Sequence, residues 1–199
     1  SNLDPPNTGG TLSASDVLIH PNDSNTIFAT IYARGIYRSN AGGAPGSWQL
    51  LSGGLPVSDV QRIELAAGPV IAPATNPTLY AVVANGSSGL HGVFRSTDNG
   101  DTWTATPGWP ARIGQTGYNL SLAVSPQDAN IVYLGLVSFY RSLDGGATWQ
   151  NQTSGNGSGA IHVDQHYSVV VKNEPNIVFI ANDGGIWRSE NANSTAAMG

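Results

Sequence analysis

The chain has 199 residues and a net charge of −5, and only 11% of its residues are charged, against roughly 25% in typical soluble domains. Its one lysine, Lys172, leaves no basic patch for phosphates, which argues against nucleic-acid binding. No apolar run is long enough to span a membrane, and the absence of cysteine excludes disulfides and thiolate metal sites.

Short β-strands separated by tight polar turns are predicted along the whole chain. Runs of β-branched and aromatic residues are bounded by Gly, Pro, Asn and Asp, and no stretch has the apolar period of a helix. In chain order the strands fall into four repeats, at about residues 12–52, 60–106, 118–153 and 166–199. The first strand of the third repeat is predicted at 118–124, and the fourth repeat is predicted to lack its last strand.

Each repeat contains a short apolar strand that ends in Arg-Ser. The four arginines are Arg38, Arg95, Arg141 and Arg188, at spacings of 57, 46 and 47 residues. A period of about 40–50 residues with four strands per unit predicts the blades of an antiparallel β-propeller. Because a ring of four blades is uncommon, residues 1–199 are predicted to form one partial propeller, completed by further blades or by a second copy.

A second motif, Ser-x-Asp-x-Gly-x-Thr-Trp, follows the Arg-Ser strand in the second and third repeats. Its residues are Ser96, Asp98, Gly100, Thr102 and Trp103 in one copy, and Ser142, Asp144, Gly146, Thr148 and Trp149 in the other. The carboxylate is expected to accept backbone N–H groups of its own turn, with the hydroxyls adding hydrogen bonds. Gly supplies a positive φ, and Trp is expected to be buried between blades. We predict a structural role for both aspartates.

These motifs resemble the Asp-box, or BNR, repeat of sialidases, sortilin-like propellers and xyloglucanase-type glycoside hydrolases. The resemblance covers nearly the whole chain and implies a propeller, whereas function depends on sites grafted onto that fold. A sialidase is disfavoured. Those enzymes carry a Phe/Tyr-Arg-Ile-Pro strand and an arginine triad, whereas this chain has Gln61-Arg62-Ile63-Glu64.

A second stretch resembles bacterial BNR-repeat glycosyl-hydrolase-like proteins. It comprises His162-Val163-Asp164-Gln165-His166 and, further along, Asn182-Asp183-Gly184-Gly185. Xyloglucanase-type enzymes place a catalytic aspartate in a similar Asp-x-Gly-Gly context in their opening blade. The opening blade here reads Tyr32-Ala33-Arg34-Gly35, so the resemblance points to Asp183 alone.

The candidate site is predicted at the mouth of the central channel. If extended, His162, Asp164 and His166 share one face, where they could bind a metal or shuttle protons; alternatively, they hydrogen-bond a loop between blades. Glycoside hydrolysis needs two carboxyl groups, for which Asp164 and Asp183 are the candidates. The alternative for Asp183 is a strand-to-strand Asp-Gly turn.

Two aromatic residues, Trp109 and Tyr118, are candidates for stacking on sugar rings, and Trp109 is equally well suited to anchoring a packed loop. We therefore expect a carbohydrate-binding or glycoside-hydrolase-like propeller that binds a polysaccharide or glycan and needs no cofactor. The low charge and many Ser, Thr and Asn residues favour an extracellular or periplasmic location. The alternatives are a noncatalytic sortilin-type propeller with a protein partner, and a structural part of an extracellular assembly.

Overall fold

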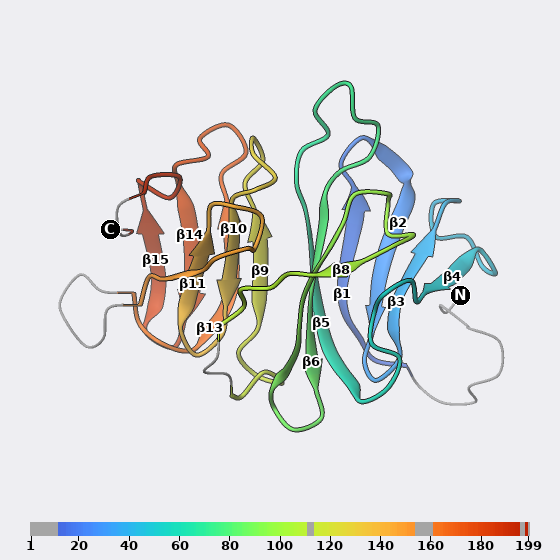
Figure 1. Cartoon of the computed structure of the whole chain (residues 1–199), viewed down its shortest axis with the longest axis horizontal. Helices are drawn as coiled ribbons and strands as arrows, with labels where there is room; N and C mark the ends of the chain where they lie inside the picture. The colour runs from blue at the N-terminus through green and yellow to red at the C-terminus, as the bar shows by residue number, and fades with distance from the viewer. Residues whose placement is uncertain (1–11, 111–113, 154–160, 196–197, 199) are drawn as a thin grey trace.

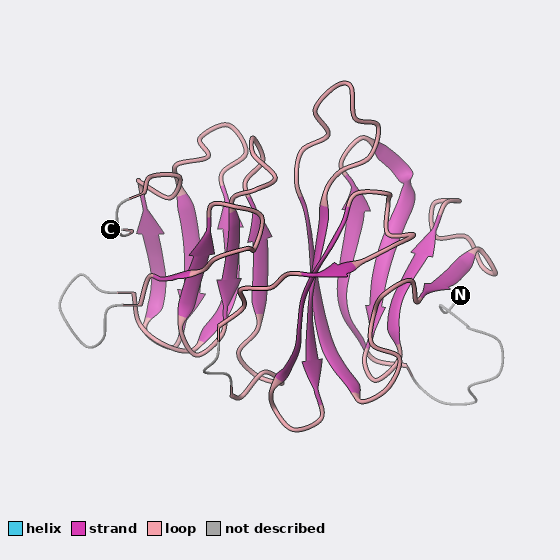
Figure 2. Cartoon of the chain, viewed as in Figure 1, coloured by secondary structure: helices cyan, strands magenta, loops and turns pink. Residues whose placement is uncertain are grey.

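The computed structural model describes residues 12–110, 114–153, 161–195 and 198. These residues form strands joined by loops and turns (Figures 1 and 2), which confirms the predicted all-β fold. No helix long and apolar enough to cross a membrane is present in this part of the chain.

The strands form four antiparallel sheets in chain order, which we call blades 1 to 4. Blade 1 comprises β1 (Ala14–His20), β2 (Asp23–Ile31), β3 (Gly35–Ser39) and β4 (Trp48–Leu51). Blade 2 comprises β5 (Val60–Ala67), β6 (Leu79–Asn85), β7 (Leu90–Ser96) and β8 (Thr104–Ala105). Blade 3 comprises β9 (Ser121–Val124), β10 (Val132–Gly135), β11 (Phe139–Ser142) and β12 (Gln150–Asn151). Blade 4 comprises β13 (Gln165–Val170), β14 (Val178–Asn182) and β15 (Gly185–Ser189).

Each blade is an up-and-down meander, and the first strands of consecutive blades contact one another. The contacts join β1 to β5, β5 to β9 and β9 to β13. These strands are therefore the inner strands of propeller blades. Blades 1 and 4 lie at opposite ends of the molecule (Figure 1), so the described residues form an open arc.

Three apolar clusters fill the spaces between consecutive blades. Because alternate residues of a strand point to opposite faces, each inner blade contributes to two clusters. In β10, Val132 and Leu134 pack with blade 2, whereas Tyr133 packs with Val178 and Ile180 of blade 4. Burial of these faces holds the blades side by side.

The two Ser-x-Asp turns are closed by their own side chains. Asp98 Oδ1 accepts hydrogen bonds from Ser96 Oγ at 2.7 Å and from Thr102 N at 2.9 Å, and Gly100 N donates to Ser96 Oγ at 3.0 Å. Desolvation opposes ionisation of Asp98, but the hydrogen bonds from Thr102 and Ser96 outweigh it and lower its pKa to about 2. Asp144 has the same contacts in blade 3.

The tryptophans of the two turns are buried to different degrees. Trp103 packs with Phe28 and Leu51 of blade 1, and its indole N–H donates to Gly100 O at 2.9 Å. Trp149 is half-buried against the cluster between blades 2 and 3, and its indole nitrogen has no hydrogen-bond partner among the described residues. The indole N–H is therefore hydrogen-bonded in the turn of blade 2 and lacks such a partner in the described part of the turn of blade 3.

Two of the repeat arginines hold a blade to the turn of the next one. Arg38 Nη1 donates to Asn99 O at 2.7 Å, and Arg141 Nη1 donates to Ala192 O at 2.9 Å. Each acceptor is the third residue after the serine that opens the turn of the following blade. The Arg-Ser strand is thus part of the repeat architecture.

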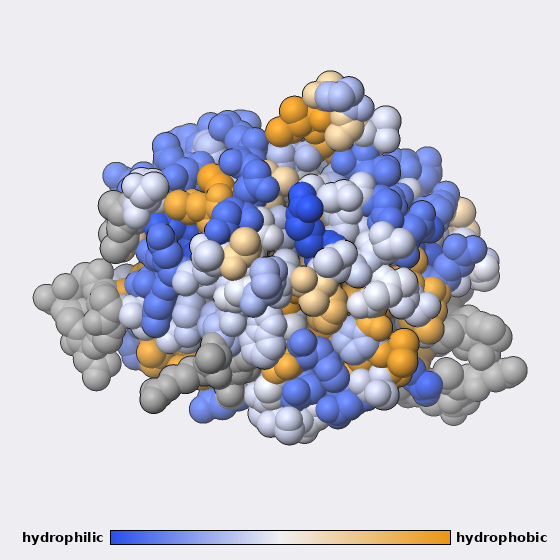
Figure 3. Space-filling view, in the orientation of Figure 1, coloured by the Kyte–Doolittle hydropathy of each residue, from blue (hydrophilic) through white to orange (hydrophobic). Residues whose placement is uncertain are grey.

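Two segments depart from the regular pattern of the repeats, the start of β9 and the loop after β5. The predicted strand at 118–124 begins only at Ser121, because the N–H groups of Tyr118 and Asn119 both bond to Gln115 O in a turn where Gln115 has a φ of 60°. In blade 2 the loop after β5 forms the apolar tip visible at the top of Figure 3, where Ile71 is exposed.

Candidate functional site

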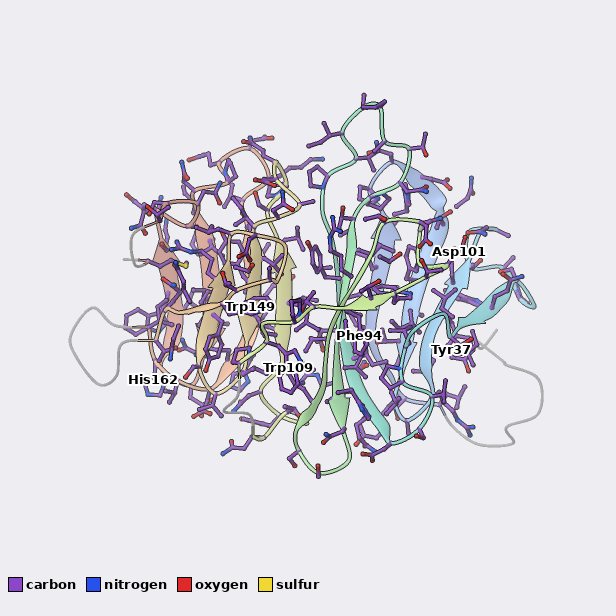
Figure 4. The ribbon with its side chains drawn as sticks, viewed as in Figure 1. Tyr37, Phe94, Asp101, Trp109, Trp149 and His162 are labelled. Carbon is purple, nitrogen blue, oxygen red and sulfur yellow. The ribbon has the colours of Figure 1, made fainter. Side chains whose placement is uncertain are left out.

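One end of the arc, which we call the mouth, gathers the start of each inner strand and the turn after each second strand. The register shows this directly, since Val60 pairs with Asn85 and Gln165 pairs with Asn182. The segments leading into β9 and β13 and the β14–β15 turn lie at this end, at the lower edge of Figure 1. His162 is labelled there in Figure 4.

Three residues proposed from the sequence meet at the mouth. His166 Nε2, on β13, lies 2.6 Å from Oδ1 of Asp183, in the β14–β15 turn. The Tyr118 ring, from the segment before β9, stands edge-on to the His166 ring with centroids 4.9 Å apart. Tyr118 is 62% exposed. The group therefore combines a carboxylate–imidazole pair with an accessible aromatic ring.

Asp164 lies beside this group, but its carboxylate is held by another partner. Asn119 Nδ2 donates to Asp164 Oδ1 at 2.6 Å, and the main-chain N–H of Asp183 donates to Asp164 O at 3.2 Å. The two candidate catalytic carboxylates thus come from adjacent backbone segments, one paired with an amide and the other with an imidazole.

The prediction that His162, Asp164 and His166 share one extended face is wrong. Asp164 has a φ of 66°, and β13 begins only at Gln165, so the segment turns where an extended strand was expected. His162 Nδ1 lies 2.9 Å from Val163 O, and its side chain packs on Gly184. The described residues contain no group of three His, Cys, Asp or Glu residues suited to a metal ion.

The turn that carries Asp183 is held by its neighbours. Asn182 Oδ1 accepts hydrogen bonds from Gly184 N and from the Trp187 indole, both at 3.0 Å, and Asn182 Nδ2 donates to His162 O at 3.2 Å. The turn is thus the tight strand-to-strand connection considered as an alternative for Asp183. It also leaves the Asp183 carboxylate directed to His166.

A charged cluster on the inner strands was missed by sequence reasoning. Arg62 on β5 bonds to Glu64 Oε1 at 2.9 Å, and its two terminal nitrogens donate to Tyr118 O and Leu120 O at 2.9 and 3.0 Å. Arg62 therefore positions the segment that carries Tyr118. The sequence did carry a signal for this cluster, because Arg62 and Glu64 are charged residues within a predicted inner strand of a chain that has few charges.

The carboxyl groups of Glu64 and Asp16 are partly buried. Burial raises the pKa of Glu64 to about 7, assisted by the charge of Asp16 and opposed by Arg62. Burial also raises the pKa of Asp16, although Asp16 Oδ2 accepts a hydrogen bond from Leu65 N at 2.7 Å. The inner face of blades 1 and 2 thus holds two carboxyl groups whose protonated forms are favoured by burial.

Trp109 is not part of the group at the mouth. Its side chain is half-buried against the core between blades 2 and 3. Figure 4 shows Trp109 below Trp149, between these blades. This placement favours the packed-loop alternative over sugar stacking.

No protein-family model matches the chain. A xyloglucanase of Hypocrea jecorina (strain QM6a) is 28% identical over 159 residues, which are 73% of this chain and 18% of that protein. A xyloglucanase of Paenibacillus sp is 31% identical over 154 residues, or 69% of this chain and 14% of that protein. The chain is similar to xyloglucanases. It spans less than a fifth of the length of these relatives.

Solved structures agree on the fold. The GH74 xyloglucanase from Xanthomonas campestris superposes with a TM-score of 0.66 at 21% identity, covering 93% of this chain and 30% of that one. An ancestral GH74 enzyme gives a TM-score of 0.63 at 18% identity, covering 94% of this chain and 24% of that one. The sequence and structural comparisons together support a glycoside-hydrolase-like β-propeller.

Proposed function

We propose that this chain is part of a secreted, glycoside-hydrolase-like propeller that binds a polysaccharide of the xyloglucan class at the mouth. The observation that carries the proposal is the exposed Tyr118 ring beside the His166–Asp183 pair. The similarity to xyloglucanases supports the choice of polysaccharide.

The geometry suits a sugar ring with hydroxyl groups at its edge. Aromatic rings present an apolar face to the C–H side of a sugar, while carboxylates and imidazoles accept and donate hydrogen bonds to hydroxyls. Tyr118 supplies the ring, and Asp183 and His166 supply the polar groups within reach of it. Arg62 positions the segment that carries Tyr118 by bonding its carbonyl oxygen.

Hydrolysis by this site requires two carboxyl groups on opposite sides of a glycosidic bond. Asp183 and Asp164 are the pair offered by the mouth, with Asp183 as the group open to a ligand and Asp164 tied to Asn119. We propose binding as the primary role of this segment and assign Asp183 as the carboxylate that contacts the glycan.

The test is binding of soluble xyloglucan by affinity electrophoresis and calorimetry. Tyr118→Ala should weaken binding at least about tenfold, because an aromatic ring buries a large apolar area against the sugar and truncation removes that contact entirely. Tyr167→Ala is a matched control, since Tyr167 is 64% exposed but lies on the side of blade 4 that faces away from blade 3.

Reducing-sugar release from the same polysaccharide separates binding from turnover. Release that disappears in Asp183→Asn would assign hydrolysis to this site, whereas binding without release would leave a binding propeller. Equal binding by wild type, Tyr118→Ala and Tyr167→Ala would contradict the proposed site.

A further inference from the structure

The repeat gives blades 1, 2 and 3 a common register. In each of them the serine of the Arg-Ser strand pairs with the same position of the second strand. The pairs are Ser39 with Ile27, Ser96 with Leu79, and Ser142 with Val132. The junction between blades 1 and 2 can therefore be compared, position by position, with the junction between blades 2 and 3.

The junction between blades 2 and 3 is filled by an indole ring. Trp109, in the segment after β8, packs against the apolar cluster that contains Val93, Leu120 and Leu136. A Cβ atom on Gly92, the residue before Val93, would lie 3.6 Å from Trp109 Nε1. The ring therefore lies beside the first residues of the Arg-Ser strand and against the incoming face of blade 3.

The corresponding place between blades 1 and 2 is a pocket. It is lined by Gly35 and Ile36 of blade 1 and by Ile63 and Val83 of blade 2, and the three apolar side chains are buried. In the same order, these residues are the register equivalents of Gly92, Val93, Leu120 and Leu136. The volume is about 370 Å³, counted with the space that opens to solvent, which is the size of a site for a small ligand.

The segment after β4 leaves this pocket open because it has a glycine where the segment after β8 has a tryptophan. Gly53 and Gly108 mark the same place, since a Cβ atom on either would clash with a main-chain oxygen in the turn of the next blade, at 2.2 Å and 1.9 Å. Trp109 follows Gly108, whereas Gly54, with a φ of 85°, follows Gly53. The next residue, Leu55, is half-buried and forms one wall of the pocket.

The rim of the pocket combines apolar side chains with one cation. Leu50 is 52% exposed and Val57 is 82% exposed, and both line the pocket together with Arg34. Arg34 is exposed and forms no ion pair with any residue that the structure describes. The described residues that line the pocket include no Asp or Glu. A guanidinium in this position can pair with a carboxylate through two hydrogen bonds.

We propose that the pocket between blades 1 and 2 binds a small aromatic carboxylate. The aromatic ring takes the place that the Trp109 indole has in the next junction, and the carboxylate pairs with Arg34 at the rim. Burial of the ring against Ile36, Ile63 and Val83 supplies the affinity. Both walls come from blades 1 and 2, so the site does not depend on how many blades the whole protein has.

This pocket differs in chemistry from the glycan site proposed at the mouth. The described residues that line it include no aromatic ring for stacking on a sugar and no carboxylate for hydrogen bonds to hydroxyl groups. Its apolar wall and single cation instead suit a ligand that is apolar over its ring and negatively charged at one end. The two sites can therefore be tested separately.

Titration with indole-3-carboxylate, followed in methyl ¹H–¹³C spectra of the Ile, Leu and Val residues, tests the proposal. We expect a dissociation constant below about 1 mM, with the largest shifts at Ile36, Leu55 and Val83. Leu55→Trp should weaken binding at least about tenfold, because its indole fills the pocket as Trp109 fills the next junction. Ile71→Trp is the matched control, since Ile71 is exposed and lies outside the pocket.

Arg34→Gln tests the charged end of the site independently, and its exposed position keeps the fold intact. It should weaken binding of indole-3-carboxylate roughly fivefold and leave binding of uncharged indole unchanged. Arg188→Gln, at another exposed arginine, should change neither. No binding below about 1 mM, shifts confined to other methyl groups, wild-type affinity in folded Leu55→Trp, or equal affinity of wild type and Arg34→Gln for the carboxylate would each overturn the proposal.

Discussion

The tight turns that carry Asp98 and Asp183 differ in the partners of their carboxylates. Asp98 is bonded within its own turn, to Ser96 and Thr102. Asp183 is bonded to His166 on another strand, while its turn is held by neighbouring residues. The partner of a carboxylate, more than the Asp-Gly context around it, therefore separates a turn-forming aspartate from a candidate ligand-binding one.

Stability should suffer most where the turn depends on its own carboxylate. Asp98→Ala removes the acceptor of the Ser96 and Thr102 hydrogen bonds, and should lower the free energy of unfolding by about 1–3 kcal/mol. Urea denaturation followed by tryptophan fluorescence measures this. Thr97→Ala, an exposed neighbour in the same turn, should change stability by less than about 0.5 kcal/mol. Equal losses in both variants would show that the Asp98 carboxylate does not hold the turn.

The buried carboxyl group of Glu64 should make stability depend on pH in the opposite sense from a turn-forming aspartate. Its pKa is about 7 in the folded protein against 4.5 ordinarily, so between these values the folded state holds a proton that the unfolded state has lost. The free energy of unfolding should therefore fall by up to about 3 kcal/mol as the pH rises through this window.

Glu64→Gln should remove that fall, because the amide does not titrate. Unfolding curves from pH 4 to 8 measure the difference, with the exposed Glu174→Gln as the control. A pH dependence unchanged in Glu64→Gln would show that Glu64 is ionised like an ordinary glutamate.

Substitution at the mouth should affect stability least. The Asp183 side chain is 46% exposed, and ion pairs at exposed positions contribute little to stability. Asp183→Asn should therefore change the free energy of unfolding by less than about 0.5 kcal/mol, measured by the same urea titration. A loss as large as that of Asp98→Ala would make Asp183 a structural residue.

The blades could be predicted from sequence because their determinants are local and repeated. The Arg-Ser strands and the turns at Asp98 and Asp144 recur at a regular spacing. Short strands can be predicted from runs of β-branched and aromatic residues bounded by turn residues. Asp183 could be selected because its Asp-x-Gly-Gly context resembles that of xyloglucanase-type enzymes. The distance between Asp183 and His166 could not be predicted, because it depends on how β13 pairs with β14.

The strand positions expected at the mouth were wrong because they depend on backbone dihedral angles, which the pattern of side chains does not encode. Gln115 and Asp164 both adopt a positive φ, and the strands that follow them begin only at Ser121 and Gln165. The bonds from Arg62 to Tyr118 and Leu120 join blades 2 and 3. Such long-range contacts depend on how the blades pack, and they cannot be predicted from the local sequence pattern.

Xyloglucan binding by folded Asp98→Asn and Asp183→Asn, measured by calorimetry at a temperature where both are native, separates the two kinds of aspartate. We predict that Asp98→Asn binds with wild-type affinity, because its carboxylate serves only its turn. We predict that Asp183→Asn binds at least about tenfold more weakly, because it loses the carboxylate that contacts the glycan. Wild-type affinity in Asp183→Asn, or the reverse order of the two variants, would contradict the assignment of Asp183 to the glycan site.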